Sequence, residues 1–246
     1  MAIGIVNANA PKQFPKVIKQ SDPVQAGMYK AVFNRFVTFG FHPDDYNEGK
    51  TKFYTHFGFE LVKDMTDTDV PLHVREYDDG TKREDPKCVS REYALMDDMH
   101  HKSNGFMLAK ALDPNVPIVT RGKENEHQYI VDFDWEANLG KTVLLQIDLK
   151  VSKAGNKYNK IVSIMPLGMP LEQKTESVYF NLYNPDLQEV WDKDVYGWEK
   201  KKITERVPVA GEPEVVYVNN NVQAEEPVVE HKEDVPPVDF DDDVPF

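Results

Sequence analysis

The chain has 246 residues, of which 40% are hydrophobic, and its formal net charge is −13. This length supports one sizeable hydrophobic core but hardly two, so we expect one folded domain with extensions. The single cysteine, Cys88, excludes an internal disulfide and a cysteine-rich zinc site, which favours a reducing, cytoplasmic compartment. The first residues lack a basic region followed by an apolar run, and no stretch approaches eighteen consecutive apolar residues, so neither secretion nor a membrane span is expected.

Residues 1–26 contain three prolines and spaced lysines without strong periodicity, and we interpret them as an N-terminal arm. From Met28 to Phe41 the odd positions are mostly apolar, an alternation typical of a long, half-buried strand. A second strand is predicted for residues 51–62. It has a phenylalanine-rich face, and Lys52, Tyr54 and His56 lie on the opposite face.

Residues 72–77 and 89–96 predict two shorter strands, separated by a charged loop at residues 78–87. Ser103 is the expected N-cap of a helix that ends at Asp113 and Pro114. After a polar stretch, residues 142–151 and 158–165 alternate again. The basic turn between them, residues 152–157, contains Gly155 and predicts a hairpin.

This order of strands, one helix and a closing hairpin predicts a mainly β fold for residues 27–170. It is the order of an oligonucleotide-binding (OB) fold, a five-stranded Greek-key barrel with a helix between its third and fourth strands. Another five-stranded barrel or a small α+β sandwich would give a similar pattern. Residues 171–206, with a predicted strand at 178–183 and a helix at 185–202, form an extension that packs on the barrel or is exchanged with a partner subunit, which leaves a homo-oligomer open.

The negative charge is concentrated in residues 207–246, a segment poor in core-forming residues that we expect to be a disordered acidic tail. After Gly211 there are eleven acidic side chains and one lysine, a net charge of −10, which leaves −3 of the total −13 for residues 1–210. The folded part is therefore free to carry a local basic groove for a nucleic acid.

The end of the tail joins acidic and apolar residues, and it is a candidate partner-binding tip. Its residues are Asp239, Phe240, Asp241, Asp242, Asp243, Val244, Pro245 and Phe246. A simple solubilising acidic run is the alternative, but such a run has no use for the final aromatic residue.

The residues from Asp241 to Phe246 resemble the C-terminal tip of bacterial single-stranded DNA-binding proteins, in which acids precede Ile-Pro-Phe; here Val244 replaces the isoleucine. The usual N-terminal domain of that family is not recognisable in residues 1–120. The layout of the chain is closer to that of single-stranded DNA-binding proteins encoded by bacteriophages, which carry such a tip on a divergent domain. The resemblance implies that the tip recruits replication and repair proteins.

Binding of single strands requires positive charge along the phosphates and aromatic faces on which bases stack. The predicted strands and the basic turn supply both kinds of side chain. The candidate DNA-binding residues are Lys52, Tyr54, His56, Arg75, Tyr77, Lys150, Lys153, Lys157, Tyr158 and Lys160. For Tyr54, stacking on a base and packing in the core are equally good interpretations.

No phosphate-binding loop, nucleophile elbow or metal-ligand spacing is present in the sequence. We therefore expect no enzyme activity, no cofactor and no metal. The leading hypothesis is a protein that coats and protects single-stranded DNA during replication, recombination and repair. The alternatives are a bacteriophage nuclease or recombination factor with a recruiting tip, and an adaptor without affinity for DNA.

Overall fold

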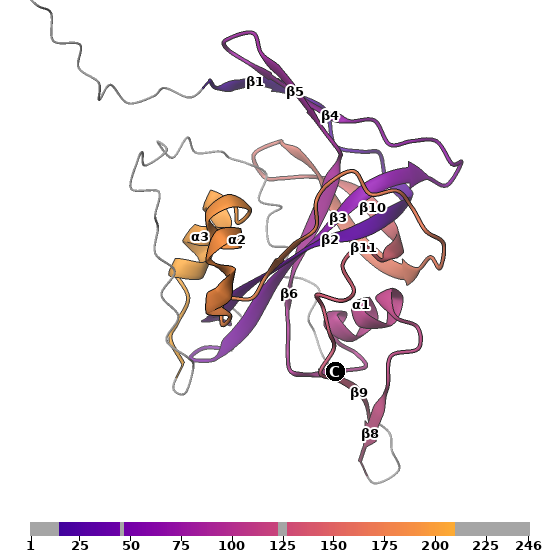
Figure 1. Ribbon diagram of the computed structural model, residues 1–246, viewed down its shortest axis with the longest axis vertical. Helices are drawn as coiled ribbons and strands as arrows, with labels where there is room; N and C mark the ends of the chain where they lie inside the picture. Colours follow the sequence, from indigo (N-terminus) through magenta and orange to yellow (C-terminus); the bar gives the residue numbers. More distant parts are fainter. Residues whose placement is uncertain (1–14, 45–46, 123–126, 210–246) are drawn as a thin grey trace, which may run out of the picture.

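The structure is a computed structural model that describes residues 15–44, 47–122 and 127–209. These residues form twelve β-strands, three α-helices and one short 3-10 helix, which confirms the prediction of a mainly β fold. Residues 210–246, which are most of the predicted acidic tail and include its tip, lie outside the described residues, whereas the Val207 amide donates to the Phe41 carbonyl at 2.7 Å. Figure 1 shows long central strands with two helices on one side and a third helix on the other.

A six-stranded sheet forms the centre of the molecule. It contains β2 (Gly27–Pro43), β3 (Thr51–Asp64), β6 (Cys88–Ala94), β10 (Thr142–Val151), β11 (Lys157–Pro166) and β12 (Val178–Phe180). The strand order is β11-β10-β2-β3-β6, all pairs along it are antiparallel, and β12 pairs with β2 in parallel. The four strands predicted from alternation at 28–41, 51–62, 142–151 and 158–165 are confirmed as β2, β3, β10 and β11.

Two smaller sheets extend from the centre. One contains β1 (Val17–Gln20), β4 (His73–Tyr77) and β5 (Lys82–Asp85), in the order β1-β4-β5; the other contains β7 (Asp98–His100), β8 (Val119–Arg121) and β9 (His127–Val131), in the order β7-β9-β8. The described end of the N-terminal arm is thus a strand. The expected charged loop at 78–87 contains β5, and the polar stretch before residue 142 contains β8 and β9.

The helix α1 (Asn104–Leu112) begins where the sequence predicts. The Ser103 hydroxyl is its N-cap and accepts a hydrogen bond from the Phe106 amide at 3.2 Å, which satisfies one of the free N–H groups of the first turn. Its residues Phe106, Leu108 and Leu112 are buried. The helix expected at 185–202 is interrupted and forms η1 (Pro185–Leu187), α2 (Gln188–Lys193) and α3 (Gly197–Thr204).

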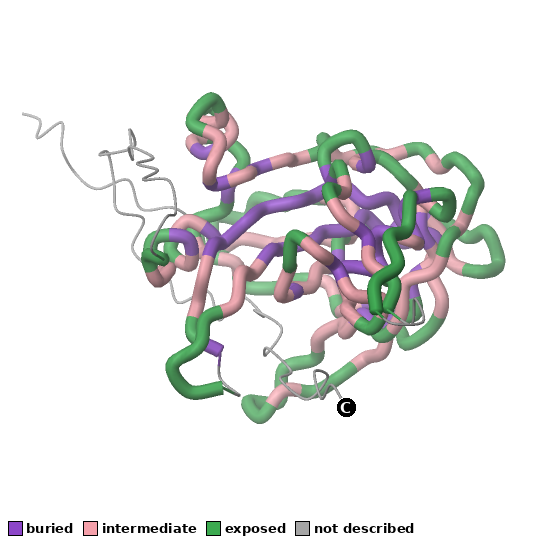
Figure 2. Tube along the Cα trace, turned by 90° about the horizontal axis from the view of Figure 1, so that it is seen from below, coloured by how far each residue is buried: buried purple, intermediate pink, exposed green. Residues whose placement is uncertain are grey.

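The buried hydrophobic side chains form two clusters, where the chain length led us to expect one. The first lies among the central strands and α1 and includes Phe33, Phe57 and Phe59; the second lies under α2 and α3 and includes Phe39 and Trp191. Figure 2 shows the buried residues concentrated along the central strands, with exposed residues at the loops.

A β-bulge explains how one strand serves both clusters. The pairing of β2 with β3 shifts between Phe33 and Arg35, so Asn34 is an extra residue on β2. Such a residue reverses which positions face each side of a sheet. Phe33 therefore faces the first cluster, whereas Val37 and Phe39 face the second, although all three have odd numbers. The single apolar face predicted for residues 28–41 is wrong for this reason.

Candidate nucleic-acid interface

The hairpin of β10 and β11 carries five of the predicted DNA-binding residues. Lys150 lies opposite Tyr158, and Asp148 lies opposite Lys160, so these four side chains share one face. Ile147 and Ile161 are buried on the other face and fix the hairpin to the first hydrophobic cluster. The structure therefore brings Lys150, Tyr158 and Lys160 together on the outside of the sheet.

A compact turn connects these strands. The Ser152 amide donates to the Asn156 carbonyl at 2.8 Å, and the Asn156 amide donates to the Ser152 hydroxyl at 3.1 Å. Gly155 has a φ of +85°, a conformation that a side chain disfavours. Lys153 in this turn and Lys157 at the start of β11 are exposed. The Lys150 ammonium lies 3.1 Å from a carboxylate oxygen of the half-buried Asp148, which reduces the local positive charge.

The residues predicted on β3 lie elsewhere. Lys52 is 3.4 Å from a carboxylate oxygen of Asp44, and Tyr54 packs edge-to-face on His42 with 6.2 Å between ring centroids. The Lys202 ammonium of α3 lies 5.8 Å from the centre of the Tyr54 ring. Of the two interpretations of Tyr54, the structure shows packing against the second cluster.

His56 is buried beneath α3. Its Nδ1 is 2.7 Å from Oε1 of Glu199, and its ring stacks on Phe39 and meets the edge of Trp198. Only 3% of the residue is exposed. The His56 side chain is therefore not accessible from the surface of the protein.

A buried ion pair between Arg35 of β2 and Glu199 of α3 holds α3 over His56. The Arg35 guanidinium donates to both carboxylate oxygens of Glu199, in one case at 3.0 Å, and to the Asp194 carbonyl at 2.7 Å. Glu199 is fully buried. Burial tends to raise the pKa of Glu199, but the hydrogen bonds and charges of His56 and Arg35 outweigh it and lower this pKa. The extension thus packs on the sheet of its own chain.

A second buried carboxylate, that of Glu60, anchors residues 174–175, which precede β12, α2 and α3 in the chain. Glu60 on β3 is 1% exposed, and it accepts hydrogen bonds from the Thr175 amide at 2.8 Å, the Thr175 hydroxyl at 2.6 Å and the Lys174 amide at 3.0 Å. These donors compensate for removing the charge from water. Together with His56, this contact shows that the outer face of β3 is occupied by protein along much of its length.

Arg75 and Tyr77 belong to β4, outside the six-stranded sheet. Arg75 is 3.6 Å from Asp85 across the β4–β5 pair, and Tyr77 lies opposite Val17 of β1. The ten predicted residues are therefore divided among the β10–β11 hairpin, the covered strand β3 and the separate sheet of β4.

A group of aromatic rings at β7 and β9 was not predicted from the sequence. His100, His101, His127 and Tyr129 are adjacent, with ring centroids between 4.1 and 6.4 Å apart, and Arg121 lies over the Tyr129 ring at 4.9 Å. The alternation of His127 and Tyr129 covers only part of the five-residue strand β9, and β7 and β8 have three residues each, so periodicity could not indicate this group. We name these four rings and Arg121 the β7–β9 platform.

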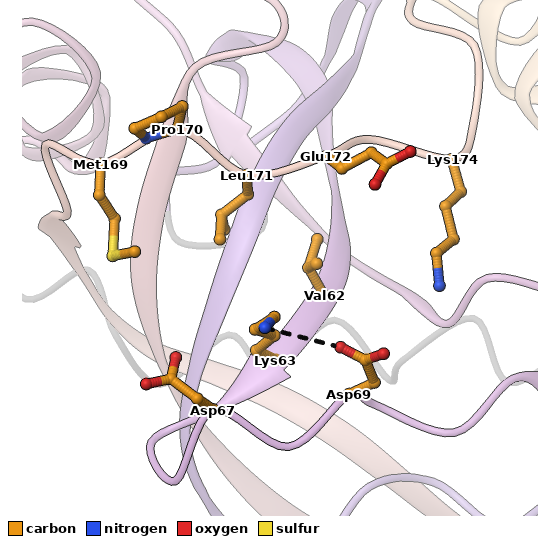
Figure 3. Close-up of a pocket in the computed structure, with 9 residues that line it drawn as sticks. All are labelled: Val62, Lys63, Asp67, Asp69, Met169, Pro170, Leu171, Glu172 and Lys174. Atoms are coloured by element: carbon orange, nitrogen blue, oxygen red, sulfur yellow. Dashed lines mark ion pairs between the residues drawn. The ribbon is translucent and has the colours of Figure 1, made fainter.

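One pocket, of about 240 Å³, lies between the end of β3 and residues 169–174 (Figure 3). Lys63 and Lys174 line it together with Asp67, Asp69 and Glu172, so both signs of charge meet there. None of the predicted DNA-binding residues lines this pocket.

Within the described ranges, no group of three or more His, Cys, Asp or Glu side chains is arranged to hold a metal ion. None of the helices described is long and apolar enough to cross a membrane. No protein-family model, curated protein or solved structure matches the chain.

Proposed function

We propose that this protein binds single-stranded DNA without strong sequence preference, as a non-enzymatic protein of DNA replication, recombination and repair. The observation that carries the proposal is the strand order β11-β10-β2-β3-β6, combined with a basic hairpin at one end of it. With β2, β3, β6, β10 and β11 as strands one to five, this order agrees with that expected of an OB-fold, and the position of α1 between strands three and four supports the same assignment.

The two outer strands of this order also approach each other. Within the described residues β6 and β11 are not paired as strands, but Arg91 on β6 donates to the Ile161 carbonyl on β11 at 2.7 Å. OB-folds are partly open barrels, so a side-chain bridge at this junction supports the assignment. The β10–β11 turn then corresponds to the loop between strands four and five, which is one of the ligand-binding loops of such folds.

The interface that we propose consists of Lys150, Lys153, Lys157, Tyr158 and Lys160, while Lys52, Arg75 and Tyr77 remain peripheral candidates. The covered face of β3 distinguishes this protein from a barrel that receives DNA across its second and third strands, and it shifts the expected path of DNA toward the hairpin. The residues from Asp239 to Phe246, outside the described part, are proposed to recruit replication and repair proteins.

A gel-shift assay on single-stranded oligonucleotides of different sequence, with and without Mg²⁺, tests the proposal. We expect retention of every sequence with similar affinity and recovery of intact DNA, because stacking and phosphate contacts are common to all bases. Mg²⁺-dependent cleavage would instead support a nuclease. Absence of retention for every oligonucleotide would leave only the adaptor hypothesis.

A further inference from the structure

The outer face of the β7–β9–β8 sheet is unusually rich in aromatic rings. His100 pairs with Tyr129, and Arg121 pairs with His127, so these residues share a face. The alternate positions Met99 and Ile130 are buried in the first hydrophobic cluster. The sheet therefore packs one face on the core and directs the β7–β9 platform outward. Figure 1 shows β8 and β9 projecting beyond α1.

The platform rings are close enough to form one continuous surface. The centroids of His100 and His101 are 4.1 Å apart, and those of His100 and Tyr129 are 5.2 Å apart. His127 and Arg121 are exposed, while the other members are half-buried. Arg121 also pairs with Asp98, which holds the guanidinium plane beside Tyr129.

Two backbone contacts orient the His100 and His101 rings. The Lys102 amide donates to Nδ1 of His100, and the Gln128 amide donates to Nδ1 of His101, each at 3.3 Å. A nitrogen that accepts a hydrogen bond carries no proton, so in each neutral ring the proton is on Nε2. Partial burial, with the neighbouring His101, His127 and Lys102, also lowers the pKa of His100. Because the rings are exposed or half-buried, their faces are surfaces that a ligand can contact.

The same hydrogen bonds argue against a metal as the ligand. An imidazole that bound a metal through Nε2 would carry its proton on Nδ1, where the backbone amides of Lys102 and Gln128 already donate. Flat, partly exposed rings beside a guanidinium instead match the requirements for stacking of unpaired bases.

We propose that the β7–β9 platform is a second contact site for single-stranded nucleic acid, at which unpaired bases stack on His127 and Tyr129 while Lys102 and Arg121 lie near the phosphates. This inference rests on the proposed function, and it adds a surface that is separate from the β10–β11 hairpin. A nucleic-acid strand bound at both sites contacts more of the protein surface than one bound at the hairpin alone.

The test measures binding of a 30-nucleotide oligothymidylate by fluorescence anisotropy at several salt concentrations. His127→Ala and Tyr129→Ala should each weaken binding on the order of tenfold, because one stacked base is lost. His127→Phe and Tyr129→Phe, which keep a ring, should bind like the wild type. The slope of log affinity against log salt should stay unchanged in all four variants, because stacking releases no counterions.

Gln128→Ala is the matched control. Gln128 is exposed and lies between His127 and Tyr129 in the sequence, but it belongs to the opposite face of β9. Circular dichroism melting identifies a variant that fails to fold. If Tyr129→Ala is unstable, His127→Ala still tests the inference, because His127 is exposed. Wild-type affinity in a folded His127→Ala overturns this inference but leaves the proposed function intact, provided that Lys153 and Lys157 variants bind less tightly. Failure of the wild-type protein to bind oligothymidylate overturns both.

Discussion

Lys153 and Lys157 are the residues on which the proposed electrostatic contact depends most. Both are exposed at the tip of the β10–β11 hairpin. Each lysine that meets a phosphate of a single strand adds about 0.7 to the slope of log affinity against log salt. Replacing both with Ala should therefore weaken binding and flatten that slope by about 1.4.

The control for this experiment is Lys141→Ala together with Lys110→Ala, which removes the same charge away from the hairpin tip. Equal effects of the two double variants would mean that only the net charge matters. An unchanged slope in Lys153→Ala/Lys157→Ala would place the phosphate contacts elsewhere on the protein.

Glu199 gives a prediction about stability at the same scale. Removal of one partner of a buried ion pair leaves the other charge uncompensated, so Glu199→Gln should lower the free energy of unfolding by about 3 to 5 kcal/mol at neutral pH. Urea unfolding followed by circular dichroism measures this loss. Glu189→Gln, which affects only an exposed pair with Lys193, should leave the free energy nearly unchanged.

The pH dependence of that difference follows from the lowered pKa of Glu199. A carboxylate with a lowered pKa in the folded state stabilises the fold above its ordinary pKa, and this stabilisation is lost as the pH falls through the lowered value. The wild type and Glu199→Gln should therefore converge in stability under acid conditions. If the difference in the free energy of unfolding between wild type and Glu199→Gln were constant down to acid pH, the charge of Glu199 would not stabilise the packing of α3.

Single residues also show why part of the site could not be predicted. Alternation along residues 51–62 correctly separated Phe57 and Phe59 from His56. The sequence could not show that the second face would be covered, because Glu199 is 143 residues from His56 and no local pattern connects them. A face that is polar in the alternation pattern can therefore be covered by a distant part of the chain.

At the scale of elements, the extension at 171–206 behaves as part of the fold. Its residues Phe180, Leu182 and Trp191 are almost fully buried with Val37 and Phe39. A chain that stops at residue 170 should therefore expose this second cluster, bind a hydrophobic dye and aggregate. A chain that stops at residue 209 keeps the cluster and should melt like the full-length protein.

Analytical size exclusion and thermal melting of the two truncated chains measure this difference. Soluble, cooperative unfolding of the shorter chain would contradict the packing of the extension on β2 and β3.

The elements also divide into those that periodicity can reveal and those that it cannot. Long strands such as β2 and β10 contain enough alternating positions for recognition, and α1 has both a capping serine and a stopping proline. Strands of three or four residues, such as β5, β7 and β8, contain too few positions for alternation to show, and β7 is fixed by pairing with β9 on the other side of α1 in the chain. The bulge at Asn34 is equally invisible, because it depends on the register of two strands.

For the whole molecule, the proposed function predicts competition between the acidic tail and DNA. The segment after Gly211 has a net charge of −10 and is tethered to a folded part that carries basic groups on its hairpin. Deletion of residues 239–246 should tighten binding of oligothymidylate modestly, and more so at low salt, because an acidic competitor is removed.

Phe246→Ala separates the two proposed roles of the tip. This variant keeps all the aspartates, so competition with DNA should persist, whereas capture of purified bacterial replication and repair proteins should fail without the aromatic anchor. Affinity capture with wild-type, Phe246→Ala and Asp241→Asn proteins makes the comparison. Full capture by Phe246→Ala would show that the tip acts only through its charge.

Hydrogen–deuterium exchange, with and without oligothymidylate, tests the central claim that single-stranded DNA binds at the β10–β11 hairpin. The amides of residues 148–160 should exchange more slowly in the complex. Exchange at residues 185–204 should stay unchanged, because α2 and α3 remain packed on the sheet. A matched duplex should give weaker protection. Unchanged exchange at residues 148–160 in a saturated complex, or faster exchange at residues 185–204, would contradict the account, since DNA would then bind elsewhere or displace the extension from β3.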